Sequence, residues 1–194
     1  MSDKKRLFVA VELPPDIKEK IYKDVEPLLS KSDQVKWVEQ ENYHFTLKFL
    51  GAVAEEKIEK VVEKLKEVSA KTGEFEMYLG NFDILPEQGP ARVIYVEVGG
   101  GEEEMNTSAF EVEEAMAGLG VTKEKRQFVA HLTVGRIKKD KGLEELKEGI
   151  KKLQGICSSI KVREFVLFES KLTHAGPTYQ ALEKFALAGK IATN

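Results

Sequence analysis

An internal duplication is the feature of this sequence that most restricts its fold. Residues 6–12, which read RLFVAVE, resemble residues 92–97, which read RVIYVE. Each copy is followed by a predicted helix and then by a His-x-Thr triplet. His44 lies 38 residues after the start of the first copy, and His131 lies 39 residues after the start of the second. This repeated order predicts two similar halves related by a pseudo-two-fold, with one histidine from each half at a shared site.

The two halves, roughly 1–90 and 91–194, are predicted to pack as one domain. A chain of 194 residues fits a single domain, and no linker-like stretch separates the halves. Hydrophobic residues make up 42% and charged residues 32%, a balance typical of a globular protein. No stretch approaches the roughly 20 apolar residues that cross a bilayer, so we expect a cytoplasmic protein with no membrane segment, and a monomer. The single cysteine, Cys157, excludes an internal disulfide and is interpreted as a packing residue.

Hydrophobic spacing and turn residues predict alternating strands and helices. Helices are predicted over 16–30 and 55–69, with a third that ends at Gly120 and a fourth that ends at Gly155. Strands are predicted at 7–13, 44–50, 75–82, 92–98, 129–137, 161–169 and 179–187. The glycines at 99–101 could form a phosphate loop, but no Lys-Ser/Thr follows them, so a turn before a helix is predicted. ATP-driven chemistry is therefore not expected.

The strand at 44–50 carries its functional groups on one predicted face. Because successive side chains alternate, His44, Thr46 and Lys48 point one way. The residues between and after them, including Phe49, are predicted to point into the core.

The strand at 129–137 repeats this pattern, with His131 and Thr133 on one face. With three histidines and eight threonines in the chain, chance gives roughly 0.12 His-x-Thr triplets, so two at matching places indicate a function. Strict alternation places Arg136 on the opposite face, but Gly135 could permit a bulge that turns the arginine inward.

Two histidines on two such strands suit acid–base chemistry at a phosphodiester. Hydrolysis needs a base for the attacking water and an acid for the departing oxygen, and the unperturbed pKa of histidine lies near neutral. Thr46 and Thr133 can donate hydrogen bonds to the non-bridging phosphate oxygens, and Lys48 and Arg136 are candidate cations nearby. In one alternative, each histidine is a half-buried strand residue satisfied by a backbone carbonyl. In the other, the pair binds a metal, which is less favoured because catalytic zinc usually has three protein ligands.

The sequence resembles the two-histidine phosphoesterases, in the branch of RNA 2′,3′-cyclic phosphodiesterases also known as 2′-5′ RNA ligases, and archaeal members in particular. The resemblance spans nearly the whole chain and is carried by residues 6–10, 37–38, 44–51, 128–136, 169–172 and 176–179. It implies an α+β fold of two pseudo-symmetric lobes, each an antiparallel sheet with helices packed outside, around a central cleft.

The same resemblance implies a reaction at RNA ends, such as those of tRNA fragments. A terminal 2′,3′-cyclic phosphate would be opened to a 2′-phosphate, with no metal or other cofactor. His44 would protonate the leaving 3′ oxygen and His131 would deprotonate water. In reverse, a 5′-hydroxyl RNA end would be joined through a 2′-5′ linkage without ATP. The resemblance also implies that Arg136 approaches the phosphate.

The remaining candidate residues each have two interpretations. Lys48 could contact phosphate or be only a charge at the rim of the site. Phe8 and Tyr179 could stack on a base, as aromatic residues do in single-stranded RNA sites, although Phe8 could equally belong to the core. His174 lacks a strand context and is interpreted as a loop residue.

Two other functions stay open at this point. The chain could bind RNA ends without turning them over, or it could act on a small cyclic nucleotide or sugar phosphate. The presence of both histidines and both threonines favours catalysis over binding alone. A formal net charge of −3 indicates that an RNA site must be a local basic patch for a partner with few phosphates.

Overall fold

The computed structural model describes residues 3–31, 33–86, 88–153, 155–156, 158–173 and 176–189. Cys157 and His174 lie outside these residues. The strands are β1 (Lys4–Glu12), β2 (Val35–Trp37), β3 (His44–Ala54), β4 (Phe75–Leu85), β5 (Val93–Gly100), β6 (His131–Ile137), β7 (Ser159–Val162), β8 (Glu164–Leu172) and β9 (Pro177–Ala186). The helices are α1 (Pro15–Val25), α2 (Glu55–Ser69), α3 (Glu102–Ala117) and α4 (Glu144–Lys152), with 3₁₀ turns η1 (Glu26–Lys31) and η2 (Gln40–Asn42). None of the helices in this part of the chain is long and apolar enough to cross a membrane.

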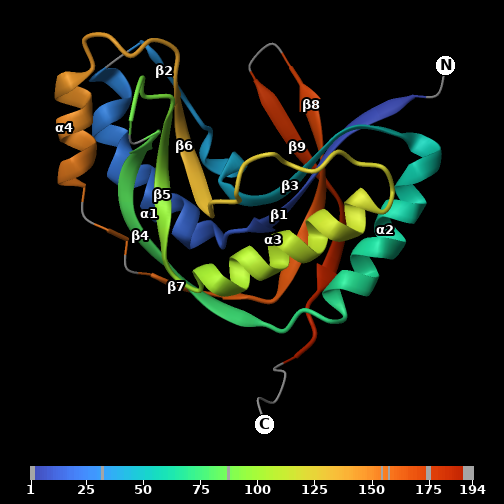
Figure 1. Ribbon diagram of the computed structural model, residues 1–194. Helices are drawn as coiled ribbons and strands as arrows, with labels where there is room; N and C mark the ends of the chain where they lie inside the picture. The colour runs from blue at the N-terminus through green and yellow to red at the C-terminus, as the bar shows by residue number, and fades with distance from the viewer. Residues whose placement is uncertain are drawn as a thin grey trace.

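The nine strands form one antiparallel sheet of two lobes. Their order is β7-β4-β5-β6-β3-β1-β8-β9, and β2 pairs with β6. The lobes meet where β3 lies against β6, through the single residue pair Phe45 and Leu132. Helices α1 and α4 lie beside the β4 lobe, and α2 and α3 lie beside the β3 lobe (Figure 1). The predicted α+β fold of two lobes with antiparallel strands and outer helices is confirmed.

The lobes are not contiguous halves of the chain. β4 belongs to the first half of the sequence but pairs with β5, and β8 and β9 belong to the second half but lie beside β1. Each half therefore contributes strands to both lobes, and the repeat boundary near residue 90 is not the boundary between them.

Helix positions follow the hydrophobic pattern, and prolines and glycines set the ends. Helix α2 matches the predicted 55–69, with Val61, Leu65 and Val68 buried as one stripe. Helix α1 ends at Val25, short of the predicted 30, and the chain continues as η1, which contains Pro27. The three-glycine turn is reduced to Gly101, whose φ of 80° precedes α3, because the two glycines before it end β5.

Strand β1 is buried on both faces, which explains its continuous apolar run. Its outer face packs into the main core beneath the helices, where Val9 is fully buried. Its other face carries Phe8 and Ala10, which form a second cluster with Val166 and Phe168 of β8. The candidate site lies directly on this second cluster, which is called the floor of the site below.

Candidate active site

His44 is held by two hydrogen bonds at the start of β3. Its Nδ1 lies 2.7 Å from the carbonyl oxygen of Asn42. Because a carbonyl only accepts, Nδ1 carries the proton, and Nε2 of the neutral ring is an acceptor. The Thr46 hydroxyl lies 2.9 Å from that Nε2 and donates to it.

His131 has a matching Nδ1 contact at the start of β6. Its Nδ1 lies 2.7 Å from the carbonyl oxygen of Val129, again two residues earlier in the chain. The edge of the ring faces Tyr95, with ring centres 5.9 Å apart and planes at 87°. Backbone carbonyls thus satisfy one nitrogen of each histidine, as the structural alternative supposed, but neither second nitrogen is held by the backbone, and that of His44 accepts only from the Thr46 hydroxyl.

The junction between β3 and β6 brings the two His-x-Thr triplets together. Phe45 and Leu132 are opposite each other and completely buried on the core side. Extending this antiparallel register by one residue sets His44 opposite Thr133 and His131 opposite Thr46. All four side chains are partly exposed on the other face. The prediction that each histidine shares a face with its threonine is confirmed.

A bulge in β3 reverses the alternation after Thr46. Thr46 pairs with Ala10 and Lys48 pairs with Val9, so Leu47 has no partner in β1. As a result Lys48 is only 3% exposed, whereas Phe49 is 56% exposed. The predictions that Lys48 shares the face of His44 and that Phe49 points into the core are both wrong.

Lys48 is a structural residue that ties β3 to α3. Its Nζ lies 2.7 Å from a carboxylate oxygen of Glu113 and donates to the carbonyl of Thr122 at 2.9 Å. An ammonium group buried with these partners is not available to a phosphate, and the suggested phosphate and rim roles do not apply.

We expect Lys48→Met to lower the free energy of unfolding by about 2 kcal/mol, because the carboxylate of Glu113 loses its partner in a largely buried position. The measurement is urea denaturation of the variant and of Lys64→Met, which breaks an exposed pair with Glu67 and should change little. If Lys48→Met instead raised KM and left the free energy of unfolding unchanged, Lys48 would contact the substrate rather than stabilise the fold.

A matching bulge in β6 turns Arg136 towards the face that carries His44. Thr133 pairs with Tyr95 and Gly135 pairs with Ile94, which leaves Val134 without a partner in β5. A Cβ on Gly135 would lie 3.0–3.3 Å from Val35, Trp37 and Ile94, so a glycine suits this packed position. Arg136 is exposed after the bulge and close enough to His44 to lower its pKa. The predicted inward turn of Arg136 is confirmed.

Aromatic side chains support His44 from below and from the side. Phe8 is 2% exposed, stacks on Phe168 at 5.2 Å and lies 4.9 Å from the His44 ring. Its suggested role in stacking on a base is therefore wrong, and it belongs to the floor. Tyr179 is half-buried and meets the His44 ring edge-on at 5.2 Å and 89°. Phe168 completes this support and was not predicted from the sequence.

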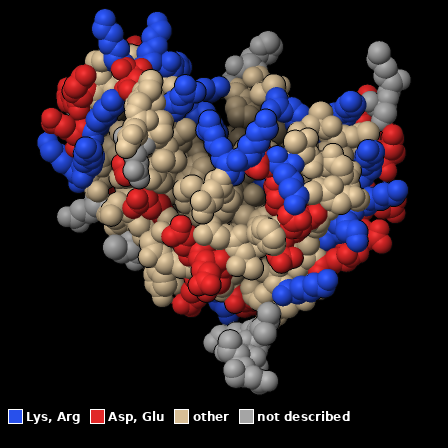
Figure 2. Space-filling view, viewed as in Figure 1, with Lys and Arg blue, Asp and Glu red and all other residues tan. Residues whose placement is uncertain are grey.

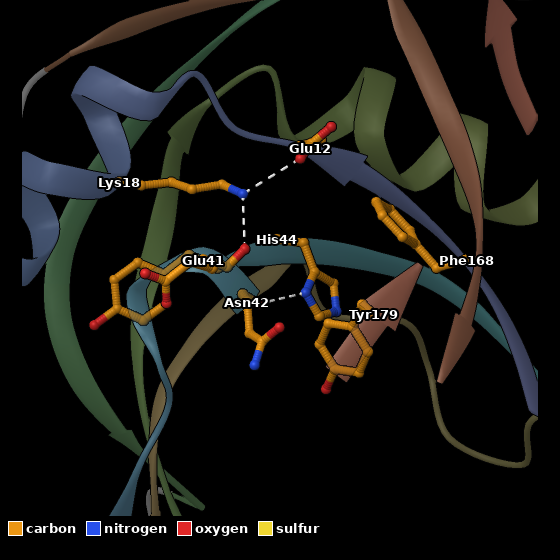
Figure 3. A pocket seen from close by; sticks show the side chains of 8 residues that line it. Glu12, Lys18, Glu41, Asn42, His44, Phe168 and Tyr179 are labelled. Carbon is orange, nitrogen blue, oxygen red and sulfur yellow. Dashed lines mark hydrogen bonds and ion pairs between the residues drawn. The ribbon is translucent and has the colours of Figure 1, made fainter. Parts of the chain in front are cut away.

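A small pocket behind His44 contains the residues that hold its turn in place (Figure 3). Lys18 extends from α1 and donates to the Glu41 carbonyl at 2.9 Å, and its Nζ lies 3.4 Å from a carboxylate oxygen of Glu12. The Asn42 side chain donates to the Pro177 carbonyl at 3.0 Å, which joins the turn to β9. These contacts fix the Asn42 carbonyl that sets the His44 tautomer.

The surroundings of His44 lower its pKa to about 4. Burial is the main cause, and the positive charges of Lys18 and Arg136 act in the same direction. The hydrogen bond to Asn42 and the charge of Glu12 oppose the shift. In the free protein His44 is therefore neutral at neutral pH, and a role as acid requires the substrate to raise its pKa.

Comparison with known proteins agrees with this geometry. The family model of LigT-like phosphoesterases matches residues 11–95 and 98–179. An RNA 2′,3′-cyclic phosphodiesterase of Archaeoglobus fulgidus is 38% identical over 181 residues, covering 93% of this chain and 99% of the relative. One of Methanocaldococcus jannaschii is 34% identical over 184 residues, with 93% and 99% covered. The crystal structure of Escherichia coli LigT complexed with 3′-AMP shares the fold, with a TM-score of 0.80, 23% identity and coverage of 95% and 98%. Together with its paired His-x-Thr strands, these matches show that the chain belongs to the LigT-like family of two-histidine phosphoesterases.

Proposed function

We propose that this chain opens RNA 2′,3′-cyclic phosphate ends to 2′-phosphates, with His44 and His131 as the acid–base pair. The observation that carries the proposal is the matched setting of the two rings. Each Nδ1 is held by a carbonyl two residues earlier, and each ring shares its face with a threonine hydroxyl at the junction of the lobes. The names of the archaeal relatives supply the substrate class.

In the proposed reaction the phosphate lies between the two triplets. His131 takes a proton from water, whose oxygen attacks phosphorus, and the bond from phosphorus to the 3′ oxygen breaks as His44 protonates that oxygen. Thr46 and Thr133 donate to the non-bridging oxygens, and Arg136 offsets their charge. The negative phosphate favours the charged form of His44, which raises the pKa that burial depresses in the free protein.

The same atoms would carry a ligation reaction. A 5′-hydroxyl RNA end in place of water would attack the cyclic phosphate and form a 2′-5′ linkage without ATP. One chain supplies both histidines and both threonines, so the site needs no second copy. The proposal is therefore that the protein acts as a monomer. Its proposed substrates are RNA ends in the cytoplasm, including those of tRNA fragments.

The test is incubation of a short RNA that ends in a 2′,3′-cyclic phosphate with the protein and excess EDTA. The expected product is the 2′-phosphate, identified by chromatography against synthetic 2′- and 3′-phosphate standards. Loss of activity in EDTA with recovery in zinc or manganese would overturn the metal-free mechanism. A 3′-phosphate product would show that the 2′ oxygen leaves instead.

A further inference from the structure

An open groove of about 500 Å³ lies beside the active site, where β5 begins and β6 ends. Arg92, Arg136 and Lys138 line it. Arg136 lines the groove and is also close enough to His44 to lower its pKa, so this arginine links the groove to the proposed phosphate position. The groove extends along the strand ends away from His131, which begins β6 at the other end of that strand.

The groove is positively charged. Arg92 and Lys138 are exposed, and neither forms an ion pair within the described ranges. Asp140 also lines the groove, but its carboxylate is already engaged by the Ala91 backbone N–H at 2.7 Å and by Lys147 at 2.5 Å. Its negative charge is therefore compensated locally and does not cancel the cations of the groove.

Arg136 of the groove also belongs to a like-charged pair. Lys36 of β2 and Arg136 of β6 are direct cross-strand partners, and both are exposed. Like charges opposite each other on a sheet repel, and among the residues that the structure describes no acid forms an ion pair with either of them. A methyl group on Gly176 would lie 3.8 Å from Lys36 Nζ, so Lys36 reaches towards the β8–β9 hairpin. An anion between the two cations would relieve their repulsion.

The charge distribution on this face fits an anionic strand. Figure 2 shows Lys and Arg side chains gathering on the upper part of the molecule, around the hollow in front of the β8–β9 hairpin. Asp and Glu side chains gather lower on the same face, near the start of α3. A protein of net charge −3 thus presents a local basic track rather than an overall positive field.

We infer that the track of Arg92, Lys138 and Lys36, which adjoins Arg136, is a second phosphate subsite that binds the phosphodiester preceding the terminal nucleotide of a single-stranded RNA. The inference rests on the proposed function, which places the cyclic phosphate at the histidines. The next phosphate of the strand is one nucleotide away, and Arg92 and Lys138 line the same groove as Arg136. A few cations without a row of aromatic residues suit backbone contacts that do not read sequence.

The test compares two substrates that end in the same nucleotide. One is a nucleoside 2′,3′-cyclic monophosphate, which has no second phosphate, and the other is a trinucleotide with a 2′,3′-cyclic phosphate end. For the parent, kcat/KM should favour the trinucleotide. In Arg92→Ala/Lys138→Ala the ratio of the two values should fall about 5–10-fold, because two exposed charge contacts are lost. The slope of log kcat/KM against log salt should decrease by about 0.7 for each lost phosphate contact on the trinucleotide.

Two variants control for charge and for side-chain loss. Lys57→Ala/Lys60→Ala removes two exposed positive charges from α2 and should leave the ratio as in the parent. Arg92→Lys/Lys138→Arg keeps both charges and should recover most of the preference. An unchanged ratio in Arg92→Ala/Lys138→Ala would overturn the subsite.

Failure of the proposed function would look different, since the parent would then turn over neither substrate. In that case the readout is fluorescence anisotropy of a labelled trinucleotide with a 2′-phosphate end. Weaker binding by Arg92→Ala/Lys138→Ala than by Lys57→Ala/Lys60→Ala would support the subsite as an RNA-binding track. Equal binding of the trinucleotide by the two variants would overturn the proposed subsite, and the groove would then bind a different class of ligand, if any.

Discussion

Replacement of His44 or His131 by alanine is expected to lower kcat/KM on an RNA 2′,3′-cyclic phosphate by about 10²–10⁴-fold. Each ring carries one of the two proton transfers, and its Nδ1 is occupied by a backbone carbonyl, so only its Nε2 can act. The double variant should be far less impaired than the product of the two single losses, because either loss already stalls a concerted transfer.

Folding must be controlled in this experiment, since His44 packs on Phe8 and Tyr179. His44→Gln and His131→Gln keep a polar side chain of similar size, and urea denaturation of all four variants reports their stability. A folded variant that retains more than about half of the parent rate would contradict the two-histidine mechanism.

Loss of a threonine hydroxyl is expected to cost about 10²-fold in kcat, with Thr46→Val and Thr133→Val as the variants. Valine keeps the shape of the side chain but cannot donate to a phosphate oxygen. Thr46 also donates to His44 in the free protein, so its hydroxyl must turn from the ring to the phosphate when substrate binds.

Serine should restore much of the rate at either position, because it keeps the hydroxyl. Thr107→Val is the matched control, since Thr107 is exposed on α3, away from the β3–β6 junction. If both valine variants kept the kcat of the parent, the two hydroxyls would have only a structural role in the sheet and would not donate to the phosphate.

The sequence predicted the paired His-x-Thr strands because their pattern is local. A histidine and a threonine two residues apart share a face in any regular strand, and the duplication places one such strand in each half. The resemblance to the two-histidine phosphoesterases is also confirmed by the family match and by the archaeal relatives.

The predictions for Lys48 and Phe49 failed where β3 stops being regular. Both His-x-Thr strands have a bulge one residue after the threonine, which sends Lys48 into the core and Arg136 onto the exposed face that carries His44. Gly135 signalled the bulge in β6, but the bulged residue of β3 is Leu47, whose type gives no such signal.

Other parts of the site depend on groups that sequence patterns do not reveal. The acceptors for the two histidines are backbone carbonyls, which every residue has. Lys18 acts on the turn before His44 from a helix in the first part of the chain, through a contact that only the fold creates. The exchange of strands between lobes likewise follows from pairing between distant segments, which periodicity does not specify.

The acid–base claim is tested most directly by the pH dependence of kcat/KM and of kcat on one cyclic-phosphate RNA, from about pH 3 to about pH 9. We expect a bell in both, because one histidine must be neutral and the other charged. In kcat/KM, which reports the free protein, one apparent pKa should lie near 4, the value for His44. In kcat the same limb should lie at higher pH, because the bound phosphate stabilises the imidazolium. The two apparent pKa values of the parent belong to the coupled pair. In the His131→Ala variant only His44 of the pair remains, so the pH dependence that persists in this variant is assigned to His44. A parent profile that is flat across this range would contradict the account.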